Sequence, residues 1–172
     1  MLQITRAITA EDYQQAYDLR AEMGRWDAAE AERLGLNPQE VLAFFYAADV
    51  QTIAKENAPP HGELLLARFA DSAAGCAAFR QVDSNTCELH HVYVRDQFRR
   101  LRIGRQMVEQ LVAAARGAGY KVMWLETTTF MQEARALYTS IGFRQRGPYN
   151  AVPAEYEPFT VSMELTLVLA HG

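Results

Sequence analysis

The 172-residue chain has only two cysteines and no apolar run near the roughly 20 residues of a membrane span. Two cysteines are too few for a disulfide framework, and the spacing of Cys76 and Cys87 matches no common zinc pattern. We therefore expect two buried thiols and no metal. The amino terminus has no basic segment followed by an apolar run, so no export signal is visible. These absences predict a cytoplasmic protein without a membrane partner.

Neither sign of charge dominates, with 17 Lys and Arg against 21 Asp and Glu and a net charge of -4. Within residues 95–105, however, five arginines face one aspartate, so this window carries +4 and the rest of the chain carries -8. An acidic protein with one cationic spot argues against broad nucleic-acid or anionic-membrane binding, which usually requires an extended basic face. The spot indicates a compact polyanionic ligand. Hydrophobic residues make up 49% of the chain, which predicts one domain over residues 1–172 with a full core.

Periodicity and turn residues predict an α/β (α+β) fold, a mixed, mostly antiparallel sheet of about seven strands flanked by about four helices. Thr9 with Asp12 and Asn37 with Pro38 are typical of helix starts. A hairpin turning at Ser84 and Asn85 would pair Cys76 with Tyr93 and Cys87 with Val82. The predicted elements are strands at 2–8, 63–69, 75–82, 87–94, 120–127, 143–149 and 160–169, and helices from 10 to about 24, 38 to about 50, 103–116 and 134–141.

The segment "CELHHVYVRDQFRRLRIGRQMVEQLV" predicts a strand, an arginine-rich loop and the first turn of a helix. A helix start exposes unpaired N–H groups with a partial positive charge, so such a loop can cradle a phosphate. Arginine side chains would add charge-assisted hydrogen bonds. Taken alone, the same pattern also fits a solvated cationic helix start.

The loop resembles the acyl-CoA-binding element of the GNAT superfamily of N-acetyltransferases. The signature of that element reads Arg or Gln, two residues, Gly, one residue, then Gly or Ala. The corresponding segment here is "RRLRIG", from Arg99 to Gly104. A second segment, "EARALYTSIGF" at 133–143, is similar to the second helix of the family. The resemblance implies an acetyl-CoA-dependent N-acetyltransferase of the GNAT fold that works by direct attack in a ternary complex. It further implies a bulge in the strand carrying Val92, whose freed N–H would hold the oxyanion. It places the pantetheine arm and the pyrophosphate on Val92, Tyr93, Val94, Arg99, Arg100, Leu101, Arg102, Ile103, Gly104 and Arg105.

Two positions depart from the family pattern. The first signature glycine is Arg102, and the asparagine usual seven residues before the helix tyrosine is Met131. A side chain at Arg102 would crowd the pyrophosphate if the backbone needed a positive φ. Because Gly104 is retained at the helix entrance, we expect Arg102 to take a right-handed helical φ and to point away.

Two residues are candidates for proton transfer. Glu88 lies four residues before Val92 on an otherwise apolar strand, and its position matches the glutamate that acts as the general base in some GNAT relatives. The alternative role for Glu88 is a structural ion pair with an arginine such as Arg80. Tyr138 matches the family tyrosine that protonates the leaving thiolate, and the alternative is a core tyrosine. A regular strand would point His90 and His91 to opposite faces, so that they could not chelate one ion together, and would leave His90 an accessory on the Glu88 face.

The acceptor is expected to be an amine, small-molecule or peptide, and the sequence does not choose among amine classes. The first 63 residues hold 11 acids against 5 bases, and aromatic residues alternate with acids around position 155, which would suit a cationic amine. One alternative is a non-catalytic acyl-CoA sensor, favoured if Glu88 is ion-paired and Tyr138 is buried. The other alternative function is a small nucleic-acid-binding module that uses Arg95 to Arg105. The sequence also leaves open whether the protein forms a homodimer.

Overall fold

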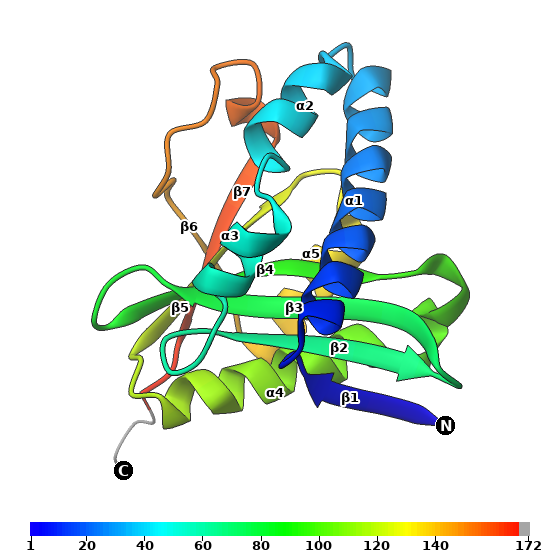
Figure 1. The fold of residues 1–172 in the computed structure, drawn as a ribbon. Helices are drawn as coiled ribbons and strands as arrows, with labels where there is room; N and C mark the ends of the chain where they lie inside the picture. The colour runs from blue at the N-terminus through cyan, green and yellow to red at the C-terminus, as the bar shows by residue number, and fades with distance from the viewer. Residues whose placement is uncertain (169–172) are drawn as a thin grey trace.

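A seven-stranded sheet runs through the centre of the computed structural model, which describes residues 1–168 (Figure 1). The strand order is β1-β2-β3-β4-β5-β7-β6, and every neighbouring pair is antiparallel except β4 with β5. The strands are β1 (Leu2–Arg6), β2 (Glu63–Phe69), β3 (Ser72–Gln81), β4 (Thr86–Val94), β5 (Val122–Thr128), β6 (Arg144–Arg146) and β7 (Thr160–Thr166). The expected mixed, mostly antiparallel seven-stranded fold is therefore confirmed. The predicted last strand reached residue 169, which lies outside the described residues.

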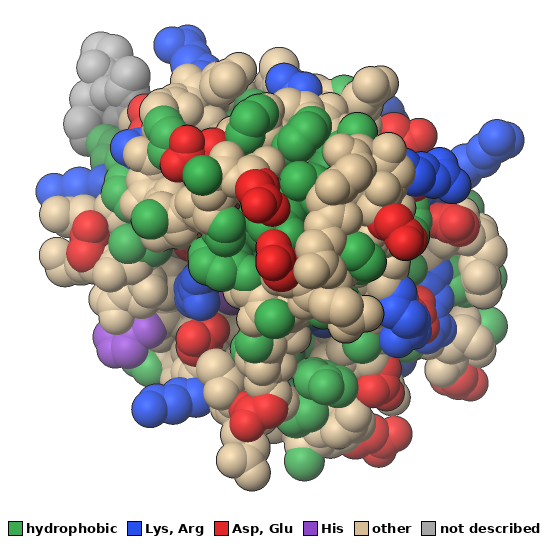
Figure 2. Space-filling view, turned by 90° about the horizontal axis from the view of Figure 1, so that it is seen from above, with side chains coloured by type: hydrophobic (Ala, Val, Ile, Leu, Met, Phe, Trp, Pro, Cys, Tyr) green, Lys and Arg blue, Asp and Glu red, His purple; other side chains and the backbone are tan. Residues whose placement is uncertain are grey.

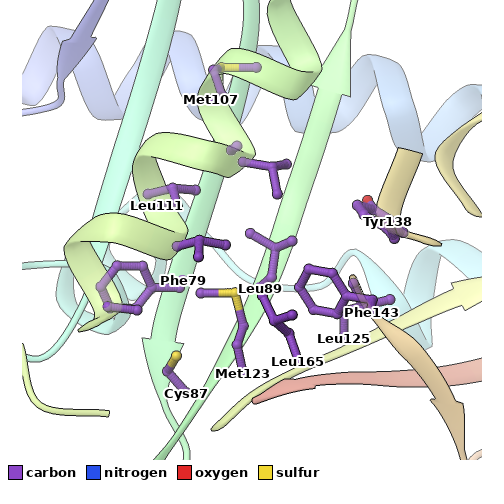
Figure 3. Close-up of a cluster of buried hydrophobic side chains, with 14 of the residues drawn as sticks. Phe79, Cys87, Leu89, Met107, Leu111, Met123, Leu125, Tyr138, Phe143 and Leu165 are labelled. Atoms are coloured by element: carbon purple, nitrogen blue, oxygen red, sulfur yellow. The ribbon is translucent and has the colours of Figure 1, made fainter. Parts of the chain in front are cut away.

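Helices cover both faces of the sheet (Figure 1). The helices are α1 (Ala10–Arg33), α2 (Pro38–Phe45), α3 (Val50–Glu56), α4 (Ile103–Gly117) and α5 (Gln132–Ile141), with short 3-10 turns η1 (Asp96–Leu101) and η2 (Glu157–Phe159). On one face, α4 and α5 bury the larger hydrophobic cluster, which includes Met107, Leu111, Met123, Phe143 and Tyr138 (Figure 3). On the other face, α1 and α3 bury a smaller cluster. The result is three layers with separate cores.

The helix starts follow the capping chemistry of the sequence. Asp12 N–H donates to Thr9 Oγ1 at 3.1 Å while the Asp12 carboxylate accepts from Thr9 N–H at 2.9 Å, a complete capping box for α1. Asn37 caps α2 as predicted. Helix α1 continues to Arg33, well past the predicted end near residue 24, and the predicted second helix is divided into α2 and α3. This side of the protein thus has three helices where two were expected, with α2 packed against α1.

Strands β4 and β5 pair only at their beginnings. The parallel register joins Thr86 with Val122 and Glu88 with Trp124, and no pairing follows although both strands continue. Strand β5 instead pairs along its whole length with β7 on its other side. Beyond Glu88, the two strands therefore separate and leave backbone groups of the middle of the sheet without a neighbouring strand. The carboxyl-terminal half of β4, which leads directly into the arginine loop, therefore lies at this opening.

A β-bulge interrupts β4 opposite β3. The register joins Cys76 with Tyr93 and Ala78 with His90, so His91 and Val92 together oppose the single residue Ala77. His91 has a φ of 56°, a left-handed conformation. The bulge implied by the family resemblance is present. It also explains a wrong prediction: Cys76 does face Tyr93, but Cys87 pairs with Gln81 and not Val82, because the register shifts by one residue at the bulge.

Candidate active site

The loop between β4 and α4 presents a helix start without a side-chain cap. The first hydrogen bond within α4 runs from Gln106 N–H to Arg102 O at 3.1 Å, and no side chain caps the helix. The N–H groups of Ile103, Gly104 and Arg105 therefore have no helical partner. Because these groups carry the positive end of a 15-residue helix, they form a suitable site for an anion.

Arg102 takes a conformation opposite to the expected one. Its φ of 58° and ψ of 25° are left-handed, where a right-handed helical φ was predicted. The prediction failed because the residue must join the end of η1 to the start of α4, and this turn requires a positive φ whether or not the residue is glycine. An arginine here bears steric strain that glycine would not. Ile103 next to it is fully buried in the core, so only its backbone faces the loop surface.

The arginines of the loop differ in their partners. Arg95 is held by Glu22 of α1 at 2.5 Å and by the Ala73 carbonyl at 2.8 Å, so it ties the loop to α1. Arg99 pairs with Asp96 at 2.8 Å and Arg105 with Glu109 at 3.1 Å. These two pairs lie on the surface, where ion pairs are weak and exchangeable.

Arg100 and Arg102 are both exposed, and neither forms an ion pair with any residue between 1 and 168. A Cβ built on Gly104 would lie 3.6 Å from Leu137 and 3.8 Å from Val94, ordinary contacts, so packing alone does not require glycine here. These features suit a site that binds pyrophosphate: two arginines without ion pairs in the described chain, uncapped N–H groups, and a glycine that packing does not require. Backbone of Val92, Tyr93 and Val94 lies at the strand opening beside this loop, as the pantetheine arm would need.

A cavity of about 480 Å³ lies between the opened strands and the helices α1 and α2. Its wall is mostly apolar and aromatic, from Met23, Leu36, Phe44, Phe45, Phe130, Val152, Tyr156 and Phe159. Figure 2 looks onto this end of the molecule, where Asp and Glu side chains lie among hydrophobic ones near the middle of the face and most Lys and Arg lie toward its edge. The cavity floor carries charged side chains from β3, β4 and β5.

Glu88 lies in this floor with both carboxylate oxygens occupied. Arg80 donates to Oε1 from Nε at 3.0 Å and from Nη2 at 2.9 Å, and Tyr149 donates its hydroxyl to Oε2 at 2.6 Å. Glu88 is only 6% exposed. The alternative that the sequence left open, a structural carboxylate paired with Arg80, is what these contacts describe. They leave neither oxygen of Glu88 without a hydrogen-bond partner.

Tyr138 points into the core cluster, and its ring lies edge-on to Phe143 with a centroid distance of 5.8 Å (Figure 3). It is 6% exposed, and burial raises the pKa of its phenol, which keeps the hydroxyl protonated. Both conditions that would favour a sensor, an ion-paired Glu88 and a buried Tyr138, are therefore met. Met131, in place of the family asparagine, accepts a hydrogen bond at its sulfur from Thr127 Oγ1 at 3.4 Å.

Sequence reasoning missed Glu126 of β5. Its Oε1 accepts from Asn150 Nδ2 at 2.7 Å, and its Oε2 has no partner within the described chain. Burial and then the nearby charge of Glu88 raise the pKa of Glu126, while the Asn150 hydrogen bond lowers it. Two residues farther along β5, Thr128 Oγ1 is buried without any hydrogen-bond partner in the described residues and also lines the cavity. A free carboxylate oxygen and an unsatisfied hydroxyl therefore face the same space.

The two histidines lie on the same side of the sheet, which corrects the expectation of opposite faces. Their ring centroids are 3.8 Å apart and both rings line the cavity, because the bulge at His91 breaks the alternation of the strand. Burial lowers the pKa of His90 well below its usual value, and burial and then Arg20 lower that of His91 to about 3. Both imidazoles are neutral. His90 Nε2 bonds Asn57 Oδ1 at 2.5 Å, which fixes its ring.

Comparisons with known proteins agree with this geometry. Residues 17–143 match the family described as Acetyltransferase (GNAT) family. An uncharacterized N-acetyltransferase of Schizosaccharomyces pombe is 35% identical over 99 residues, covering 55% of this chain and 61% of that protein, so the match spans less than two thirds of the relative. The IAA acetyltransferase of Azospirillum brasilense is 32% identical over 120 residues, covering 69% of this chain and 74% of that protein.

The crystal structure of the Paia N-acetyltransferase from Thermoplasma acidophilum in complex with coenzyme A superposes with a TM-score of 0.75. It covers 96% of this chain and 99% of that one at 13% identity, which shows the shared fold. A family match over most of the chain and a common fold lead to one conclusion. This chain belongs to the GNAT family of acetyltransferases. No helix within residues 1–168 is long and apolar enough to cross a membrane.

Proposed function

We propose that this protein is an acetyl-CoA-dependent N-acetyltransferase that transfers the acetyl group directly to an amine. The observation that carries the proposal is the opening between β4 and β5, along which β4 runs from the cavity at Glu88 to the uncapped, cationic helix start that follows Val94. The same cavity holds the free carboxylate oxygen of Glu126. The sites predicted for acetyl-CoA, the backbone of residues 92–94 and the loop of residues 99–105, keep their roles in this proposal.

In this proposal, the N–H groups of Ile103 to Arg105 and the side chains of Arg100 and Arg102 bind the pyrophosphate. The thioester carbonyl lies at the bulge of His91 and Val92, where a backbone N–H stabilises the oxyanion. The acceptor nitrogen forms the C–N bond, and the C–S bond breaks. One proton leaves the nitrogen for a carboxylate, and the thiolate takes one from a phenol.

We assign proton removal to Glu126 because it has a free oxygen and a raised pKa in the cavity. Glu88, the base predicted from the sequence, stays a candidate, with Arg80 and Tyr149 as the groups that would have to release it. Tyr138 keeps the predicted role of acid toward the thiolate. Its protonated phenol can donate the proton; because the side chain is buried in the core cluster, it would have to become accessible to the thiolate.

A non-catalytic acyl-CoA sensor is the second candidate, because Glu88 is ion-paired and Tyr138 is buried. The two functions separate in one assay. Purified protein is mixed with acetyl-CoA and pools of amines, and thiol release and acetylated products are followed by absorbance and mass spectrometry. Amine-dependent thiol release with a matching product supports the enzyme. Saturable acetyl-CoA binding without any amine-dependent release would establish the sensor.

Three broader expectations belong to the same proposal. The protein would work in the cytoplasm, where acetyl-CoA is supplied, and would need no metal ion. Residues 1–172 would act as one catalytic domain, because the sheet positions both the cofactor loop and the cavity. Partners other than the amine acceptor are not required by this chemistry.

A further inference from the structure

Arg20 of α1 is a buried cation with no acidic partner. It is 6% exposed and lines the cavity, yet no carboxylate within residues 1–168 lies at ion-pair distance from it. Its acceptors are all neutral: the Phe45 carbonyl at 2.9 Å, the Ala48 carbonyl at 3.4 Å and His91 Nδ1 at 3.0 Å. Since burying an unpaired charge is costly, this arrangement calls for a reason.

Three other partly buried arginines do have acids. Arg80 pairs with Glu88 and Glu56, Arg68 with Asp12, and Arg95 with Glu22. Glu56, the acid that acts on Arg20 through space, is itself bound to Arg80 at 3.0 Å. Arg20 is therefore the cavity arginine without a direct ion pair in the described chain, in a lining that also contains Asp27, Glu56, Glu88 and Glu126.

The guanidinium is also only partly used as a donor. It has five N–H groups, of which three are engaged by the contacts above. The Tyr46 ring lies 5.2 Å from its central carbon and fixes its plane. A planar, immobilised guanidinium with unused N–H groups is suited to bind a carboxylate through bidentate hydrogen bonds.

We infer that the amine acceptor carries a carboxylate, which Arg20 binds, and that the acceptor is an α-amino acid with an apolar side chain. This inference rests on the proposed function. Arg20 contacts His91, the bulge residue, so a carboxylate bound to it would lie next to the reacting centre, as the carboxylate of an α-amino acid lies next to its amine. The aromatic wall of the cavity would hold the side chain, and Glu126 would face the amine.

The first test compares matched acceptors on the unaltered protein. L-Leucine and L-phenylalanine are tested against leucinamide, phenylalaninamide, isopentylamine and phenethylamine, and kcat/KM is measured by thiol release. We expect the amino acids to be preferred by about 10- to 100-fold, the worth of one charge-assisted contact. Equal or better rates with the amides, the amines or short peptides would overturn the inference while leaving the acetyltransferase proposal standing.

The second test changes the arginine. Arg20→Met should remove most of the preference for the amino acids, and Arg20→Lys, which keeps the charge but not the planar fork, should remove part of it. Arg68→Met is the matched control, since Arg68 also ties α1 to the sheet but lies outside the cavity. If Arg20 only holds the structure, Arg20→Met and Arg68→Met would lower rates with amino acids and amines alike.

A third readout does not require turnover. Calorimetry with coenzyme A present should show L-leucine or L-phenylalanine binding to the unaltered protein, and no binding of isopentylamine or phenethylamine. Binding of the amino acids without any thiol release would contradict the proposed activity and keep the carboxylate site. Binding of the amines as tightly as the amino acids would remove the carboxylate site whatever the activity.

Discussion

The arginines of the loop before α4 and those of the cavity differ in how they are held. In the loop, Arg100 and Arg102 are exposed and form no ion pair within the described chain, and Arg99 bonds its surface neighbour Asp96 and the Val94 carbonyl. In the cavity, Arg20 and Arg80 are held by three or more contacts each. Exposed, exchangeable cations suit a ligand that brings its own strong negative charge. Immobilised cations instead fix the geometry of groups around a reacting centre.

The largest expected effect lies in the cavity. Glu126→Gln should lower kcat by about 100- to 10,000-fold, because the amide cannot accept the proton of the attacking amine. Calorimetric affinity for acetyl-CoA should not change, since Glu126 lies away from the loop. The matched control is Glu32→Gln on the exposed end of α1, which should leave kcat within twofold.

The same residue sets a pH dependence. Since the pKa of Glu126 is raised, its carboxylate becomes protonated at a higher pH than an ordinary glutamate, and kcat/KM should fall with decreasing pH from that point. This fall in kcat/KM at low pH, the acid limb of the pH profile, should be absent in Glu126→Gln. A larger loss in Glu88→Gln than in Glu126→Gln, with the limb retained in the latter, would move the base to Glu88.

The next effect tests the loop. The double variant Arg100→Ala with Arg102→Ala should weaken acetyl-CoA binding by about 10- to 100-fold at low salt, and by much less at high salt, because exposed charges are screened. Arg144→Ala, an exposed arginine on β6, is the control. An unchanged dissociation constant would show that the backbone N–H groups of α4 bind the anion alone.

Thr128 offers a smaller effect with two readouts. Thr128→Val replaces a buried hydroxyl that has no partner within residues 1–168, so the free energy of unfolding should stay equal or rise. If the hydroxyl binds a substrate, kcat/KM should fall by roughly 3- to 10-fold, the worth of one neutral hydrogen bond. Loss of stability without loss of activity would indicate a structural role instead.

The smallest effect concerns Arg102 itself. Because its φ is 58°, Arg102→Gly should raise the free energy of unfolding by roughly 1 kcal/mol through relief of left-handed strain. Arg102→Ala, which removes the charge but keeps a Cβ, should not give this gain. Denaturant unfolding of the two variants measures the difference, and equal stabilities would mean that the loop relaxes around either residue.

Local chemistry made much of the fold predictable. Thr9, Asp12 and Asn37 mark helix starts because their side chains satisfy backbone N–H groups. The predicted end of α1 near residue 24 was wrong for a tertiary reason. Gly24 does not stop the helix; a Cβ there would lie 3.1 Å from the Tyr46 ring, so glycine allows α2 to approach. Helix α3 was missed although its cap, Asp49, was present.

The site was less predictable because it depends on contacts far apart in the sequence. The motif located the loop, but the left-handed Arg102 follows from how η1 meets α4. Glu126 and Arg20 become site residues only when α1 and the segment around Asn150 line the same cavity as β4 and β5. The stacked histidines follow from a bulge that shifts the register within a single strand pair.

The most direct test of the account is a calorimetric titration of acetyl-CoA into the unaltered protein at two salt concentrations. The account predicts saturable one-to-one binding that coenzyme A competes for and that weakens as salt rises, because the loop cations bind the phosphates. No binding heat or thermal stabilisation by acetyl-CoA or coenzyme A at either salt concentration would contradict the assignment of the loop, and with it the proposed acetyltransferase activity.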